Sequence, residues 1–225
     1  LLGVHVTDNH SDDDGGGVAV DQEHGELVMK QSAITANTAD DEGGGLMVGQ
    51  HAVVRLTNVT VSGNAANRSG GGVNLDATGG LVFLHNVTVT DNTVDADDNG
   101  GDGGGIDQDG VPEDSLFQVR NTIVAGNTDA STNDQVDPDC NDDIVSEGHN
   151  LIGDDTGCGF VDAPGDQVGT AAAPIDPLLG PLALNGGTTP NHALLAGSAA
   201  IDAGGDPNDA PPIDQRGLPR DAAPD

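Results

Sequence analysis

Carboxylates are the side chains of this sequence that could do chemistry, because Asp and Glu together number 38. They gather in loops, and carboxylate oxygens are hard ligands that suit Ca²⁺. Weak calcium candidates lie around the fourth glycine-rich block at Asp97, Asp98, Asp102, Asp107 and Asp109. Further clusters occupy residues 12–14 and 137–143. None of these stretches fits an EF-hand loop, so a solvated acidic surface is the preferred interpretation and calcium binding is the alternative.

Polysaccharide cleavage is the second chemistry that the acidic residues raise. Hydrolysis needs two carboxylates as acid and base, and elimination needs a basic residue beside the substrate. Asp107 and Asp109 form the best carboxylate pair, but one pair means little in so acidic a chain. Basic residues are scarce, and the first 135 residues contain only Lys30, Arg55, Arg68 and Arg120. We therefore predict that the chain is not an enzyme, with no catalytic residue and no organic cofactor.

The two cysteines, Cys140 and Cys158, are separated by 18 positions in a region rich in Gly and Asp. No neighbouring Cys or His has zinc-finger spacing. One disulfide formed in an oxidising compartment is the favoured prediction, and two unrelated free thiols are the alternative. A disulfide places the chain outside the cell or on its surface.

The formal charge of −32 excludes several classes of partner. A surface so negative repels nucleic acid and anionic membranes. No apolar run approaches the ~18 residues that a membrane-spanning helix needs. At molar salt the screening length falls to about 3 Å, which removes most of the self-repulsion. The charge therefore favours a halophilic source, with a calcium-loaded surface as a compatible alternative.

The elements that would carry these residues come from an internal repeat. Triple-glycine blocks begin at Gly15, Gly43, Gly70 and Gly103. An asparagine closes a short strand at intervals of 28, 27, 28 and 35 residues, at Asn9, Asn37, Asn64, Asn92 and Asn127. Within each unit, apolar and polar residues alternate, as in Val59 to Ser62. Each repeat therefore predicts about three strands of three to five residues, joined by sharp corners.

Stacking the repeats at about 4.8 Å would close every strand against the next and form an aliphatic column. Asparagine suits the corners because it tolerates a left-handed backbone and its amide can bond the equivalent amide one coil away. We predict two such ladders, one through Asn58, Asn86 and Asn121 and the other through the Asn9 to Asn127 series. The glycine blocks would form the third corner, where the chain needs positive φ.

The last third of the chain departs from this spacing and carries a family resemblance. The stretch DPLLGPLALNGGTTPNHALLAGSAAIDAGG, with CNDDIVSEGHNLIGD before it and DQRGLPRD after it, resembles the end of surface proteins with a choice-of-anchor Q region. The resemblance implies export, a surface location and a right-handed parallel β-helix. It brings no known reaction. The apolar pieces at residues 177–184 and 192–201 are expected to continue the column in irregular coils and then cap it.

Together these observations predict an all-β chain with two regions. Residues 1–135 would form about five coils of about 28 residues, and residues 136–225 a disulfide-stapled continuation and cap. The expected function is that of a secreted structural or adhesive protein that binds copies of itself, in filaments, or a surface glycan. A polysaccharide lyase or glycoside hydrolase is the alternative. Among four sequons, Asn67 is the one predicted to carry a glycan, because the others fall on ladder positions.

Overall fold

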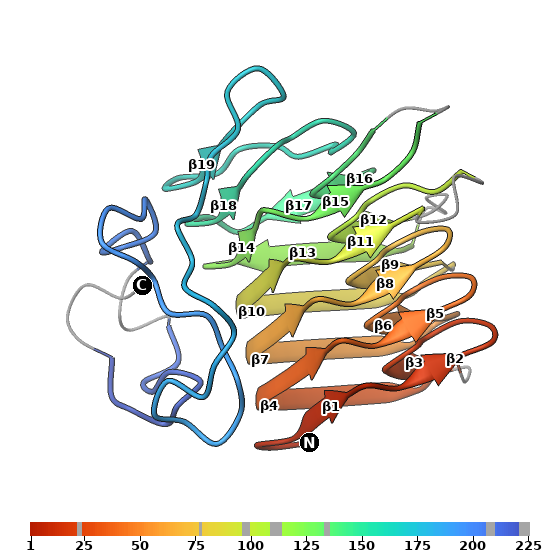
Figure 1. The fold of residues 1–225 in the computed structure, drawn as a ribbon, viewed down its shortest axis with the longest axis horizontal. Coiled ribbons are helices and arrows are strands. Elements are labelled where there is room, and N and C mark those ends of the chain that lie inside the picture. Colours follow the sequence, from red (N-terminus) through yellow and green to blue (C-terminus); the bar gives the residue numbers. More distant parts are fainter. Residues whose placement is uncertain are drawn as a thin grey trace.

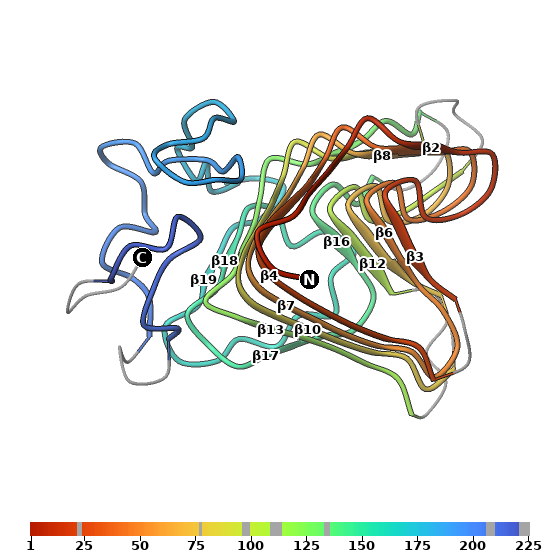
Figure 2. The same ribbon diagram turned by 90° about the horizontal axis from the view of Figure 1, so that it is seen from below.

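The computed structural model describes residues 1–21, 24–76, 78–95, 100–108, 114–132, 136–205 and 210–220. Within these ranges the chain is all-β, and its strands form three parallel sheets stacked in chain order (Figure 1). Seen from below, successive turns of the chain overlie one another as nested loops (Figure 2). The predicted solenoid of parallel strands is confirmed at this level.

The three sheets differ in strand length. Sheet A contains β1 (His5–Thr7), β4 (Glu26–Thr35), β7 (Val53–Ser62), β10 (Leu81–Thr90), β13 (Leu116–Arg120), β14 (Ile123–Val124), β17 (Ile144–Ser146), β18 (Leu151–Ile152) and β19 (Gln167–Val168). Sheet B contains β2 (His10–Ser11), β5 (Thr38–Ala39), β8 (Ala65–Ala66), β11 (Thr93–Val94) and β15 (Thr128–Asp129). Sheet C contains β3 (Val18–Val20), β6 (Leu46–Val48), β9 (Val73–Leu75), β12 (Ile106–Gln108) and β16 (Cys140–Asn141).

The core is a column of aliphatic side chains from equivalent positions in successive repeats. In sheet A, Ile34 pairs with Val61, Val61 with Val89, and Val89 with Val124. All four side chains are buried. Because parallel strands lie about 4.8 Å apart, each side chain packs on its equivalents in the turns above and below. A chain almost without aromatic residues therefore still fills its interior.

The strands of sheet A are longer than the sequence predicts. β4, β7 and β10 each span 10 residues, where two short strands separated by a corner were expected. Residue pairing with the neighbouring turn resumes directly after the corner residue, as it does on both sides of Asn58, which has φ 53°. The bend therefore removes almost no backbone hydrogen bonds between neighbouring strands. One bent strand takes the place of the two short strands that were expected.

The asparagine series from Asn9 to Asn127 forms the amide ladder that its spacing predicts. Each Nδ2 donates to the Oδ1 of the next member at 2.9 Å, in the direction of the C-terminus. The left-handed backbone at this corner belongs to the preceding residue of each repeat, namely Asp8, Ala36, Gly63, Asp91 and Gly126. The two properties that make Asn suitable for a corner are thus divided between neighbouring residues.

The C-terminal region does not cap the column as predicted. Strands β16 to β19 do extend sheets A and C, but residues 176–205 and 210–220 leave the stack and run back along its side (Figure 1). The two apolar pieces bridge each other through Leu179 and Leu194 instead of joining a parallel sheet. Contacts with Gln31 and Ser32, near the N-terminal end of the stack, hold this segment in place.

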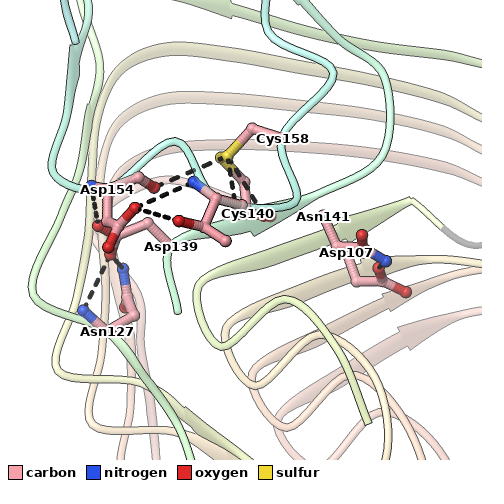
Figure 3. The surroundings of a disulfide bond; sticks show 8 residues. Asp107, Asn127, Asp139, Cys140, Asn141, Asp154 and Cys158 are labelled. Atoms are coloured by element: carbon pink, nitrogen blue, oxygen red, sulfur yellow. Dashed lines mark hydrogen bonds between the residues drawn. A yellow bond between two sulfur atoms is a disulfide. The ribbon is translucent and has the colours of Figure 1, made fainter. Parts of the chain in front are cut away.

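The predicted disulfide between Cys140 and Cys158 is present, with Cα atoms 5.2 Å apart (Figure 3). It joins β16, the last strand of sheet C, to the turn that follows β18. Cys140 is fully buried in the core. The bond therefore fixes the irregular end of the column to its last regular turn.

Candidate functional site

The C-terminal segment, defined here as residues 176–205 and 210–220, docks on one corner of the stacked turns (Figure 2). The corner residues have φ between 45° and 59° and are Gln31, Asn58, Asn86, Asn121 and His149, one from each successive repeat. We call them the docking column. Their left-handed backbone turns the chain sharply, and Asn accepts this conformation more readily than most residues.

Four of the five side chains in the docking column make hydrogen bonds to the backbone of the C-terminal segment. The bonds are Gln31 Nε2 to Asp214 O (3.4 Å), Asn58 Nδ2 to Ile213 O (2.8 Å), Gly205 N to Asn121 Oδ1 (2.9 Å) and His149 Nδ1 to Ala203 O (3.0 Å). Four side chains of the docking column thus bond to the main chain of the C-terminal segment. Among the described residues, none of them bonds to the equivalent side chain of a neighbouring repeat.

These contacts correct the prediction of a second amide ladder. Asn58, Asn86 and Asn121 have the expected left-handed backbone. Within the described residues, however, no hydrogen bond joins one of their amides to another. Asn86 Nδ2 and Oδ1 are buried without a partner, and so is Asn121 Nδ2. The physical reason is orientation, because these side chains leave the column and face the C-terminal segment.

A cavity of about 340 Å³ lies between part of the docking column and the C-terminal segment, beside these contacts. The three asparagines of the docking column and His149 line it on one side. Hydroxyl and amide groups add to this polar wall through Thr88, Thr122, Asn150, Gln167 and Gln215. Apolar surface comes from Val87, Ile123, Leu151 and Leu194. The lining therefore combines donors, acceptors and aliphatic groups, which is the usual character of a small-ligand pocket.

From the described residues, the cavity lining receives one carboxyl group, from Asp214, and two guanidinium groups, from Arg216 and Arg220. Arg216 holds Asp214 through Nε and Nη2, at 2.7 and 2.6 Å from Oδ2. Arg220 Nη2 donates to Asn58 Oδ1 at 3.0 Å. Among the described residues, Asp214 is the single carboxylate of the lining, and Arg216 balances its charge. The described part of the lining is thus far less acidic than the chain as a whole.

Ser62 and His192 resemble a nucleophile and its base, since Ser62 Oγ lies 2.9 Å from His192 Nε2. His192 Nδ1 donates to the carbonyl of Gly180 at 2.8 Å, which leaves Nε2 as an acceptor when the ring is neutral. Ser62 is buried at the end of β7 and does not line the cavity. A substrate in the cavity therefore has no access to Oγ, and the pair serves to attach the C-terminal segment to sheet A.

The different bonding of Asn58 and Asn86 predicts different effects of the same substitution. Glycine keeps the left-handed backbone at both positions. Asn58→Gly removes two hydrogen bonds, one from an arginine, and we expect it to lower the free energy of unfolding by about 2 kcal/mol. Asn86→Gly removes no bond and should change it by less than about 1 kcal/mol. Urea denaturation measures both values, and equal losses would contradict this assignment.

Of the five calcium candidates, the structure describes Asp102 and Asp107, so their grouping as a site stays untested. Asp97, Asp98 and Asp109 lie outside the described residues. Asp107 is buried in β12, where its Oδ1 accepts a hydrogen bond from Asn141 Nδ2 at 2.9 Å (Figure 3), and the Asp102 carbonyl accepts one from Gly70 N. In the part of the chain that the structure describes, two other groups bring three possible ligands together, namely His10, Asp12 and Asp40, and Asp13, Asp14 and Asp41. Solvated acidic groups of this kind are common in proteins that bind no cation, so we do not assign a cation site to them.

One buried carboxylate has a distinct electrostatic role, because the amide ladder ends on it. Asn127 donates its backbone N and its Nδ2 to Asp139 Oδ1, at 3.0 and 2.9 Å (Figure 3). Asp154 N donates to Oδ2 at 2.8 Å. Burial raises the pKa of Asp139 to about 6, although these three hydrogen bonds act in the opposite direction.

The raised pKa of Asp139 predicts a pH dependence of stability. The folded protein binds this proton below about pH 6, whereas the unfolded chain binds it below about pH 3.8. The group therefore contributes stability that is fully present below pH 3.8 and is lost as the pH rises through 6, up to about 3 kcal/mol. Urea denaturation from pH 4 to 7 should show this slope in the wild type and not in Asp139→Asn. Exposed Asp162→Asn is the control, and parallel curves for all three proteins would refute the assignment.

Two sequence predictions concern the surface of the repeats. Asn67 is partly exposed just after β8, on the chain between β8 and the third glycine block. Its glycosylation stays a prediction. Arg55 lies with its guanidinium 4.3 Å from the centre of the Phe83 ring, on the outer face of sheet A. This contact accounts for Arg55 without a catalytic role.

Comparisons with models of known protein families, with curated proteins and with solved structures found no match to this chain. The resemblance to surface proteins with a choice-of-anchor Q region therefore stays a prediction. Within the described residues, no helix has the length and apolar character needed to cross a membrane.

Proposed function

We propose that this chain is an extracellular structural or adhesive protein, built as a right-handed parallel β-helix of about five coils of about 28 residues. The observation that carries the proposal is the amide ladder from Asn9 to Asn127, continued by Asp139. Four of these six residues have 3% exposure or less. A continuous buried ladder favours one rigid arrangement over alternatives, because any break leaves polar groups unpaired.

A rigid rod of this kind suits a protein that presents or spaces other groups at a surface. The disulfide is typical of proteins outside the reducing cytosol. The net charge of −32 suits a solvent with molar salt, where repulsion between acidic groups is screened. Surface location, halophilic origin and the choice-of-anchor Q resemblance belong to this proposal.

Polysaccharide cleavage, the alternative function, has less support from the cavity. Glycoside hydrolysis in its usual form requires two carboxyl groups on either side of the scissile bond. In the part of the chain that the structure describes, the cavity lining contributes one carboxylate, Asp214, which is held by Arg216. The lining is therefore better suited to binding than to acid–base chemistry.

Labelling of intact cells tests the proposed location. A membrane-impermeant amine reagent or a specific antibody should reach the protein on cells that produce it, while a cytosolic marker stays unlabelled. Electron microscopy of the purified protein in about 2 M salt tests the mode of action. Filaments that dissociate on dilution would establish self-assembly, and single rods would leave adhesion. A protein found only inside unbroken cells would contradict the proposal.

A further inference from the structure

Asn86 is the exception in the docking column and needs an explanation. Its neighbours Asn58 and Asn121 both bond the C-terminal segment, whereas both amide atoms of Asn86 are buried without a partner. Asn121 Nδ2 is a third such atom. A buried polar group without a hydrogen bond is costly, and folded proteins contain few. Three of them together, at the wall of one cavity, indicate that a ligand forms the missing bonds.

Asn86 and Asn121 occupy neighbouring turns. Thr88 of β10 pairs with Ile123 of β14. Asn86 and Asn121 each lie two positions before these paired residues, so they occupy equivalent places in the two turns. Strands paired in this way lie about 4.8 Å apart. Asn86 offers the two N–H donors of Nδ2 and the acceptor Oδ1, and Asn121 Nδ2 offers two further N–H donors. This set matches adjacent hydroxyl groups, because a hydroxyl both donates and accepts.

The remaining lining narrows the class of ligand. Nucleic acids and other polyanions are repelled by a chain of charge −32. A metal cation would need carboxylates, and the single carboxylate that the described residues contribute to the lining is bound to Arg216. The aliphatic side chains of Val87, Ile123 and Leu194 suit the C–H surface of a small ring. An uncharged ligand with several hydroxyl groups and an apolar face satisfies all of these conditions.

We propose that the cavity binds one residue of an uncharged saccharide, with hydroxyl groups held by the amides of Asn86 and Asn121. The inference rests on the proposed adhesive function, whose partner it names. Because the amide atoms are buried, the ligand reaches them only when the described chain packed on them shifts, and Gly205 is packed on Asn121. Binding should therefore alter the hydrogen-exchange rate of the Gly205 amide, which now bonds Asn121 Oδ1.

The test uses the full chain in about 2 M salt. Galactose, mannose, N-acetylglucosamine, their common disaccharides and glucuronate are titrated by calorimetry and by NMR. At least one neutral sugar should bind saturably and change the exchange rate of the Gly205 amide. Asn86→Gly should weaken this binding at least ten-fold. The matched control is Gln31→Gly, which alters the same column outside the cavity and should change binding less than two-fold.

Three outcomes would overturn the inference. The first is that no neutral sugar binds saturably, in which case the buried amides have no saccharide partner. The second is equal loss of affinity in Asn86→Gly and Gln31→Gly, which would place the binding elsewhere. The third is glucuronate binding ten-fold tighter than every neutral sugar, which would show that the ligand is anionic. Surface labelling of cells is independent of these measurements, so failure of the proposed function would be seen separately.

Discussion

Replacing Asn64 with alanine is expected to lower the free energy of unfolding by about 3 to 5 kcal/mol. Asn64 lies in the middle of the amide ladder and is fully buried. Its Nδ2 donates to Asn92 Oδ1 at 2.9 Å and to the carbonyl of Ile34 at 3.0 Å. Its Oδ1 accepts from the backbone N of Asn37 at 3.1 Å and from Asn37 Nδ2 at 2.9 Å. Alanine removes all four bonds and leaves their partners buried.

Asn9→Ala is the matched control, because Asn9 belongs to the same ladder at its exposed end. Its Nδ2 donates to Asn37 Oδ1 and to the carbonyl of Thr7, and water can replace these bonds. We expect a loss of about 1 kcal/mol or less. Urea denaturation of the two variants beside the wild type measures the difference. Similar small losses in both would show that the ladder contributes little to stability.

The stacked sheets could be predicted from the sequence because their cause is local and repeated. Spacings near 28 residues bring equivalent residues into register, and alternation along the strand decides which side chains enter the column. The Asn9 to Asn127 ladder follows from the same spacing. The series through Asn58, Asn86 and Asn121 has equally regular spacing, yet its amides point out of the column. Residue type and interval are the same in both series, so only the three-dimensional fold distinguishes them.

The site could not be predicted, because it depends on contacts between residues far apart in the sequence. Gln31 and Asp214, which meet across the docking interface, are 183 positions apart. Asn58 meets Ile213 across 155 positions. Neither the apolar pieces of the C-terminal segment nor its prolines indicate whether it closes the end of the stack or covers its side. The sequence does contain one signal for the docking column. In each of the long strands β4, β7 and β10, one polar residue with an amide side chain stands near the middle, namely Gln31, Asn58 and Asn86.

Replacing Gly44 with alanine should have the other large effect, about 4 kcal/mol or more, or prevent folding. Gly44 is the second residue of its glycine block, where the chain passes close to the backbone of sheet B. A Cβ atom here would overlap the carbonyl of Ala65 and lie 2.6 Å from the carbonyl oxygen of Gly71. Both obstacles are backbone groups held by the stacked turns. They cannot rotate away as a flexible side chain would.

Gly63→Ala separates this clash from the general cost of replacing glycine. Gly63 has φ 67°, but the nearest atom to an added Cβ is 3.9 Å away. Ala36 occupies the equivalent corner one turn earlier with φ 55°, so the fold already accepts alanine there. We expect Gly63→Ala to lose about 1 kcal/mol. Urea denaturation compares the two variants, and an insoluble Gly44→Ala beside a folded Gly63→Ala supports the same conclusion. If Gly44→Ala is as stable as Gly63→Ala, the turns can separate locally, and close backbone packing is not what requires glycine at this corner.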